Sequence, residues 1–268
     1  MKHRLTLLLS LPFTICITLF YTLSRCLSGV SFHGWTNVLL WCTLGAGLLL
    51  SIWLGISGSK QKETFVNVAQ WQNSLRITAL VCGCICFIGG ALNFFNGLQM
   101  LLSAKSATPS PIFFILLGFL LVVGGVYICL CPTPNSTTQT RDALFGMALP
   151  IASIIRVLDL YFETSTPKNA SAKLFISLTY LLLALYWLSD LRLTLGRANV
   201  GYHKTLIPLV TMICGGVAVG ECLSALILKT SLTYGGLDLL FFVISFLLIN
   251  IKGCFAFQTP ENEVLDIE

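Results

Sequence analysis

The chain consists of long, uninterrupted apolar runs separated by short polar segments. Each run is long enough, at roughly 20 residues, to cross about 30 Å of hydrocarbon as a helix. None shows the two-residue alternation of a membrane β-barrel strand. The pattern predicts an all-α polytopic transmembrane bundle, with residues 1–268 forming a single transmembrane domain. About eight spans are expected, near residues 5–24, 36–56, 77–102, 111–131, 143–163, 173–191, 205–228 and 232–251.

The overall composition agrees with the pattern. Hydrophobic residues make up 56% of the 268 positions and charged residues 10%, and the mean hydropathy is +0.86. These values exclude a soluble domain of this length. The spans leave little room for a folded domain outside the membrane, so the lipid bilayer is the first partner that the chain predicts.

Lysine and arginine in the short loops predict the orientation, because such residues remain preferentially on the cytoplasmic side. With the N-terminus inside, the cytoplasmic segments hold ten of them, and the opposite segments hold five, Arg25, Lys105, Lys168, Lys173 and Lys229. The ten are Lys2, Arg4, Lys60, Lys62, Arg76, Arg141, Arg192, Arg197, Lys204 and Lys252. An even number of spans then places both termini in the cytoplasm. The net charge of +5 reflects this topology, and no nucleic-acid partner is expected.

The sequence was compared with the short motifs that are typical of enzymes, metal sites and cofactor sites, and its cysteine run is the first candidate. The eleven cysteines include the run CGCIC, but on a helix only Cys82 and Cys86 share a face, which favours small apolar packing over a metal site. No HExxH motif, GxSxG elbow, Walker loop or GxGxxG fingerprint occurs in the sequence. The sequence therefore predicts no cofactor and no metal, and it does not favour an enzyme.

Ionisable residues inside the spans are the strongest sign of function, because charge is costly in hydrocarbon. Arg156, Glu221 and Asp238 each lie eight residues from a polar residue at the outer end of a span, or about 12 Å deep at about 1.5 Å per residue. Asp159 lies one turn shallower than Arg156. Asn93 and Asn96 add amide groups in the same outer half of the third span.

If the four ionisable residues met fully charged, one positive and three negative groups would share a site of low dielectric constant. Such an imbalance requires a bound cation, a protonated acid or water. The functional hypothesis is an outward-facing pocket for a cationic or zwitterionic solute, with Arg156 as a fixed counter-ion or as a clamp for an anionic group. In the structural alternative, Arg156 pairs with Asp159 and Glu221 and ties three helices together.

Two helix irregularities lie beside these residues. Pro150 interrupts the fifth span and removes the hydrogen bond to the Gly146 carbonyl. Gly216 and Gly220 form a GxxxG step that permits close helix approach next to Glu221. At the inner end of the sixth span, Asp190 and Arg192 are interpreted as charges that reach the membrane interface, in preference to an inner gate.

The segments RVLDLYFETSTPKNASAKLF and LSDLRLTLGR, between Arg156 and Arg197, resemble a group of uncharacterised multi-spanning membrane proteins of clostridial bacteria. The resemblance implies a bacterial cytoplasmic membrane and no particular activity. It also implies that one recurring unit contains Arg156, Tyr161, Lys173, Asp190 and Arg192.

Two function classes stay open. A small-solute carrier, or a substrate-binding membrane subunit, predicts that water reaches Glu221 and Asp238, with a polar solute or a proton as the ligand. A non-transporting partner or sensor subunit predicts that the charges pair internally, with another membrane protein or a second copy of the chain as its partner.

Overall fold

The computed structural model describes residues 2–28, 34–59, 73–103, 110–130, 139–163, 170–195, 200–229 and 235–255. These residues form helices throughout and contain no strand. The helices are α1 (Lys2–Ser28), α2 (Trp35–Ser59), α3 (Asn73–Ser103), α4 (Ser110–Leu130), α5 (Gln139–Gly146), α6 (Ala148–Phe162), α7 (Ser171–Thr194), α8 (Val200–Leu228) and α9 (Gly235–Phe255).

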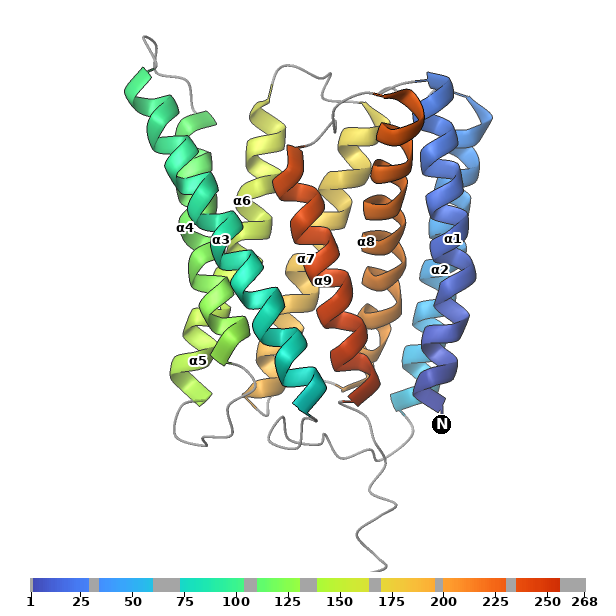
Figure 1. The fold of residues 1–268 in the computed structure, drawn as a ribbon. Helices are drawn as coiled ribbons and strands as arrows, with labels where there is room; N and C mark the ends of the chain where they lie inside the picture. Colours follow the sequence, from blue (N-terminus) through green and yellow to red (C-terminus); the bar gives the residue numbers. More distant parts are fainter. Residues whose placement is uncertain are drawn as a thin grey trace, which may run out of the picture.

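Eight segments are long and apolar enough to cross a membrane, and α5 and α6 together supply the fifth. The prediction of an all-α polytopic transmembrane bundle with about eight spans is confirmed. The first residues of α1 and the last residues of α9 lie at the same end of the bundle (Figure 1). We call this the inner end, following the distribution of Lys and Arg, and the opposite one the outer end.

The fifth span is interrupted where the sequence predicts it. Met147 forms a turn between α5 and α6, and its backbone N–H donates to the carbonyls of Ala143 at 3.1 Å and Leu144 at 3.2 Å. Pro150 follows three residues later. Because proline has no N–H, it cannot continue the helical hydrogen bonding of the preceding turn.

Helices α3 and α4 form a tightly packed hairpin, drawn side by side in Figure 1. Their contact is lined by glycines seven residues apart, Gly83, Gly90 and Gly97 on α3 facing Gly118 and Gly125 on α4. A Cβ atom at Gly118 would lie 2.5 Å from the backbone nitrogen of Phe94 and 2.7 Å from the Gly90 carbonyl oxygen. No side chain larger than hydrogen fits between these backbones.

Helix α8 is the most buried span and contacts α1, α2, α7 and α9. The GxxxG step permits the approach of α1, as the sequence predicts. A Cβ at Gly216 would lie 2.4 Å from Cγ2 of Ile17, and a Cβ at Gly220 would lie 2.9 Å from Cδ1 of Tyr21. The hairpin of α3 and α4 contacts the other helices at two places: α4 packs against α6, and α3 packs against α9.

Candidate functional site

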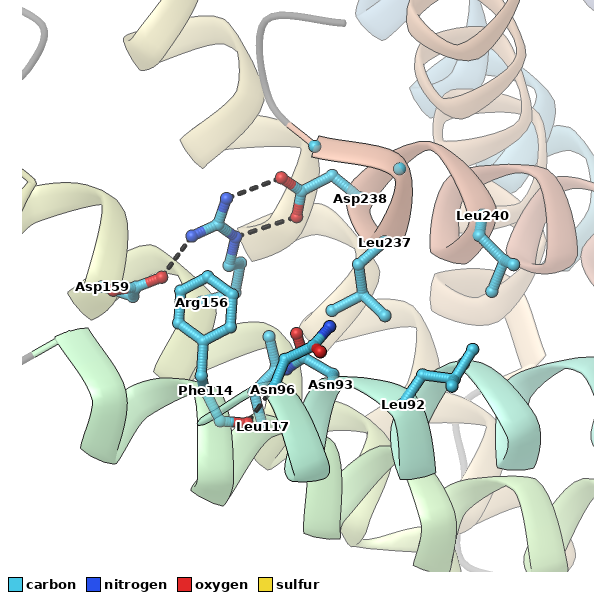
Figure 2. Close-up of a pocket in the computed structure, with 13 residues that line it drawn as sticks. Leu92, Asn93, Asn96, Phe114, Leu117, Arg156, Asp159, Leu237, Asp238 and Leu240 are labelled. Atoms are coloured by element: carbon cyan, nitrogen blue, oxygen red, sulfur yellow. Dashed lines mark hydrogen bonds and ion pairs between the residues drawn. The ribbon is translucent and has the colours of Figure 1, made fainter. Parts of the chain in front are cut away.

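A partly open pocket of about 360 Å³ lies between α3, α4, α6 and α9 in the outer half of the bundle. Its polar wall comes from Asn93 and Asn96 on α3, Arg156 and Asp159 on α6, and Asp238 on α9. Apolar residues complete the lining, among them Leu92, Phe114, Leu117, Leu237 and Leu240. Figure 2 shows Arg156 between the two carboxylates.

Arg156 is held by the two acids. Its Nε donates to Oδ1 of Asp238 at 2.8 Å and its Nη2 to Oδ2 of the same carboxylate at 2.6 Å, a bidentate pair. Its Nη1 donates to Oδ2 of Asp159. The side chains are 13% exposed for Arg156, 10% for Asp159 and 3% for Asp238. The guanidinium is thus committed to carboxylates of this chain, which favours the role of fixed counter-ion over that of an anion clamp.

The backbone explains why these side chains meet. Arg156 and Asp159 are three residues apart on α6 and therefore share a face. Asp238 lies in the first turn of α9, where the helix dipole favours an acid. This helix begins at Gly235, which has a φ of +76°, so Asp238 lies only about 4.5 Å along the axis from the helix start.

The two asparagines differ in their hydrogen bonding. The Nδ2 of Asn93 donates to the Phe114 carbonyl at 2.9 Å, which joins α3 to α4, and its side chain is buried. Asn96 is exposed and, among the described residues, has no hydrogen-bond partner. The Oδ1 of Asp159 also accepts no hydrogen bond from the described residues. Asn96 and Asp159, which both line the pocket, therefore each carry a polar group without a hydrogen-bond partner among the described residues.

Glu221 lies elsewhere. It does not line the pocket, and its Oε2 accepts a hydrogen bond from the Tyr21 hydroxyl at 2.9 Å. Its Oε1 lies 3.7 Å from Nη2 of Arg25. Both partners belong to α1, so the proposed convergence of four ionisable groups is replaced by two separate clusters. The pairing of Arg156 with Glu221 in the structural alternative is not formed, because Asp238 takes that place.

Sequence reasoning missed three members of these clusters. Tyr180 on α7 is buried and donates its hydroxyl to Oδ1 of Asp238. Tyr21 does the same for Glu221, and Arg25, assigned to a loop, is buried in the last turn of α1. A tyrosine within a predicted span is the sequence feature that could have indicated these partners, because its hydroxyl needs a hydrogen-bond partner when it is buried.

A third cluster lies at the inner end. Nζ of Lys252 lies 2.5 Å from Oδ2 of Asp190, and it also lies 5.6 Å from the ring centre of Trp187. The interpretation of Asp190 as an interface charge was therefore wrong, since the carboxylate is buried, whereas Arg192 is exposed as that interpretation requires. His203 is buried in α8, and its Nδ1 lies 3.1 Å from the Ser189 hydroxyl.

The five residues expected to belong to one recurring unit do not gather at one site. Arg156 lies at the outer pocket, whereas Asp190 and Arg192 lie at the opposite end of the bundle. Lys173 donates to the Glu163 carbonyl at 2.7 Å and links α6 to α7, and Tyr161 is exposed. The residues of the proposed recurring unit are thus distributed over α6 and α7 and over both ends of the bundle.

The cysteine run follows helical geometry. Cys82 and Cys86 are buried, and Cys84 between them is exposed, as the spacing predicts. Within the described part of the chain, no group of three or more His, Cys, Asp or Glu residues is placed to hold a metal ion.

Comparisons with protein-family models, with curated proteins and with solved structures found no match to this chain.

The separation of Glu221 from the pocket can be tested by a double-mutant cycle. We expect Tyr21→Phe and Glu221→Gln to couple by about 0.5–3 kcal/mol, because the two side chains are in contact. Glu221→Gln and Asp238→Asn should instead be additive within about 0.5 kcal/mol, as for independent sites. Thermal and denaturant unfolding in detergent measures both cycles, and strong coupling of Glu221 with Asp238 would contradict the two-cluster arrangement.

Proposed function

We propose that this multi-pass membrane protein is a small-solute carrier, or a substrate-binding membrane subunit, whose pocket takes a cationic or zwitterionic solute. One observation carries the proposal: Asp159, whose Oδ1 accepts no hydrogen bond from the described residues, lines a pocket in which the Arg156 guanidinium is already paired with two carboxylates of this chain. A positively charged group is the natural partner for that oxygen.

The charges of the pocket support a cation. One arginine and two aspartates give a formal charge of −1 when all three are ionised. A buried excess charge is costly unless a counter-ion, a proton or water compensates it. A solute with an ammonium group, or a proton on one carboxyl, would remove the excess, and the Asn96 amide would supply a further hydrogen bond.

The cellular location follows from the same proposal and from the sequence. The resemblance to clostridial proteins supports a bacterial cytoplasmic membrane, with the pocket on the extracytoplasmic side according to the Lys and Arg distribution. A solute would then reach the pocket from outside the cell.

A second candidate function is a non-transporting partner or sensor subunit. It is favoured by the internal pairing of charges outside the pocket, Arg25 with Glu221 and Lys252 with Asp190. In this candidate, the Arg156 network joins α6 to α9 and holds no solute, and the partner is another membrane protein or a second copy of the chain.

A ligand-dependent melting experiment separates the two candidates. The purified protein is heated in a neutral detergent with a panel of solutes, namely propylamine, ethanolamine, choline, arginine and, as an anionic control, acetate. A ligand that binds only the folded protein raises the melting temperature. For a carrier, we expect stabilisation by at least one cation, and at least a tenfold loss of its affinity in Asp159→Asn.

Glu221→Gln is the matched control, because it also removes a buried negative charge but lies outside the pocket. It should retain the ligand response. No response of the native protein to any cation, with equal destabilisation by Asp159→Asn in every solution, would reject the solute pocket and leave the structural candidate.

A further inference from the structure

The pocket is bounded in part by side chains that face the lipid. Leu92 on α3 lines the pocket although it is 61% exposed, and Asn96, one turn further along the same helix, is exposed as well. On the opposite side, Gly235 and Gly236 at the start of α9 are exposed. Exposed surface at the depth of a span contacts acyl chains. The pocket therefore communicates sideways with the outer leaflet, between α3 and α9.

Polar and apolar groups are sorted along the pocket. Figure 2 shows Arg156, Asp159 and Asp238 gathered at one end, and Leu92 and Leu240 at the other. The sorting follows depth, because α3 runs from the inner to the outer end and α9 runs in the opposite direction. On both helices, the leucine is therefore the deeper residue: Leu92 relative to Asn96, and Leu240 relative to Asp238.

The deep end is closed. A Cβ on Gly89 would lie 3.3 Å from Cδ2 of Leu240, so α3 and α9 are in close contact there. An apolar group that enters this end cannot continue toward the inner side between α3 and α9. The exposed Leu92 leaves it a direction sideways into the hydrocarbon.

We propose that the ligand of this pocket is an amine-bearing amphiphile, with its ammonium group on Asp159 and its apolar chain between Leu92 and Leu240. The inference rests on the proposed function and specifies its substrate class. A solute that is polar throughout would leave the leucine end unmatched, whereas an outer-leaflet amphiphile already has its head outward and its chain toward the midplane. The volume of about 360 Å³ is at the lower end for ligand pockets and suits a head and the first part of a chain.

Three probes of defined chemistry test the inference on the full chain in a neutral maltoside detergent. Dodecylamine carries both the head and the chain, propylamine carries the head with a short chain, and dodecanol carries the chain without a charge. The melting temperature is recorded against probe concentration, and native mass spectrometry counts bound probe. We expect dodecylamine to reach half-saturation at a concentration at least tenfold below that of propylamine, and dodecanol to give no saturable shift.

Leu92→Trp tests the apolar end, because the larger side chain fills it and leaves the acids unchanged. We expect at least a tenfold loss of dodecylamine affinity and an unchanged propylamine affinity. Leu102→Trp is the matched control on the same helix, where the side chain is 88% exposed and outside the pocket. It should bind both amines as the native chain does.

The outcomes separate this inference from the proposed function. Equal affinity for propylamine and dodecylamine would overturn the amphiphile and leave the cation pocket standing. Dodecanol binding as tightly as dodecylamine would overturn the role of the amine. Failure of both amines on the native chain would overturn the inference, and the proposed function falls with it only if no other cation of the melting panel binds. The comparison of probes on the native chain decides the matter even if Leu92→Trp does not fold.

Discussion

Replacing Arg156 with methionine is expected to lower the free energy of unfolding by about 3–5 kcal/mol, the cost of breaking a buried ion pair. The change removes the cation and leaves two carboxylates, on Asp159 and Asp238, buried beside each other. Denaturant and thermal unfolding in detergent measure the loss. Arg192→Met is the matched control, because Arg192 is exposed and its removal should change stability little.

Two further variants show whether the loss of stability in Arg156→Met comes from the unbalanced charge or from the lost shape of the guanidinium. Arg156→Met combined with Asp159→Asn and Asp238→Asn removes the excess negative charge and should recover most of the lost stability. Arg156→Lys should give an intermediate loss, because a single ammonium group cannot make the bidentate contact with Asp238. If Arg156→Met unfolds at the same temperature as the native protein, the network does not hold α6 and α9 together.

Adding one methyl group at Gly118 is expected to destabilise the protein by about 1–3 kcal/mol, the usual range for overpacking. The new Cβ would meet backbone atoms of α3 at 2.5 and 2.7 Å, and backbone cannot rotate away as a side chain can. Gly45→Ala provides the control, since a Cβ there meets nothing within 4 Å. That change should be neutral or stabilising by up to about 1 kcal/mol, because alanine favours helix. Equal melting temperatures for the two variants would contradict the close contact of α3 and α4.

The spans could be predicted because the bilayer imposes a single requirement of length and apolarity on each of them. The second span was placed at residues 36–56 and occupies Trp35–Ser59. The predicted spans differ from the observed helices at their ends, where polar and apolar residues alternate in the sequence. The eighth span was placed from residue 232, and the described part of α9 begins at Gly235.

The composition of the pocket could be predicted only in part. Charged residues in spans are rare, so Arg156, Asp159 and Asp238 stand out in the sequence. Which helices meet is a different question, because hydropathy carries no information about packing order. Glu221 has the same apparent depth as Arg156, yet α8 directs it to α1.

The spacing of glycines in α3 and α4 is a further sequence signal of helix packing. The glycines of α3 and α4 recur every seventh residue, at Gly83, Gly90 and Gly97 and again at Gly118 and Gly125. Seven residues are two helical turns, so such glycines share one face. This spacing occurs in both helices of the hairpin and therefore indicates which two helices meet. The GxxxG step occurs in α8 alone and does not identify α1 as its neighbour.

The helices around the pocket are joined in two different ways. Tyr180 with Asp238 joins α7 to α9 near the outer end, and Asp190 with Lys252 joins them at the inner end. The hairpin of α3 and α4 is instead held by close backbone contacts at glycines, and at the deep end of the pocket it meets α9 where Gly89 contacts Leu240. The pocket therefore lies at the boundary between a unit joined by polar side chains and a unit joined by glycine packing.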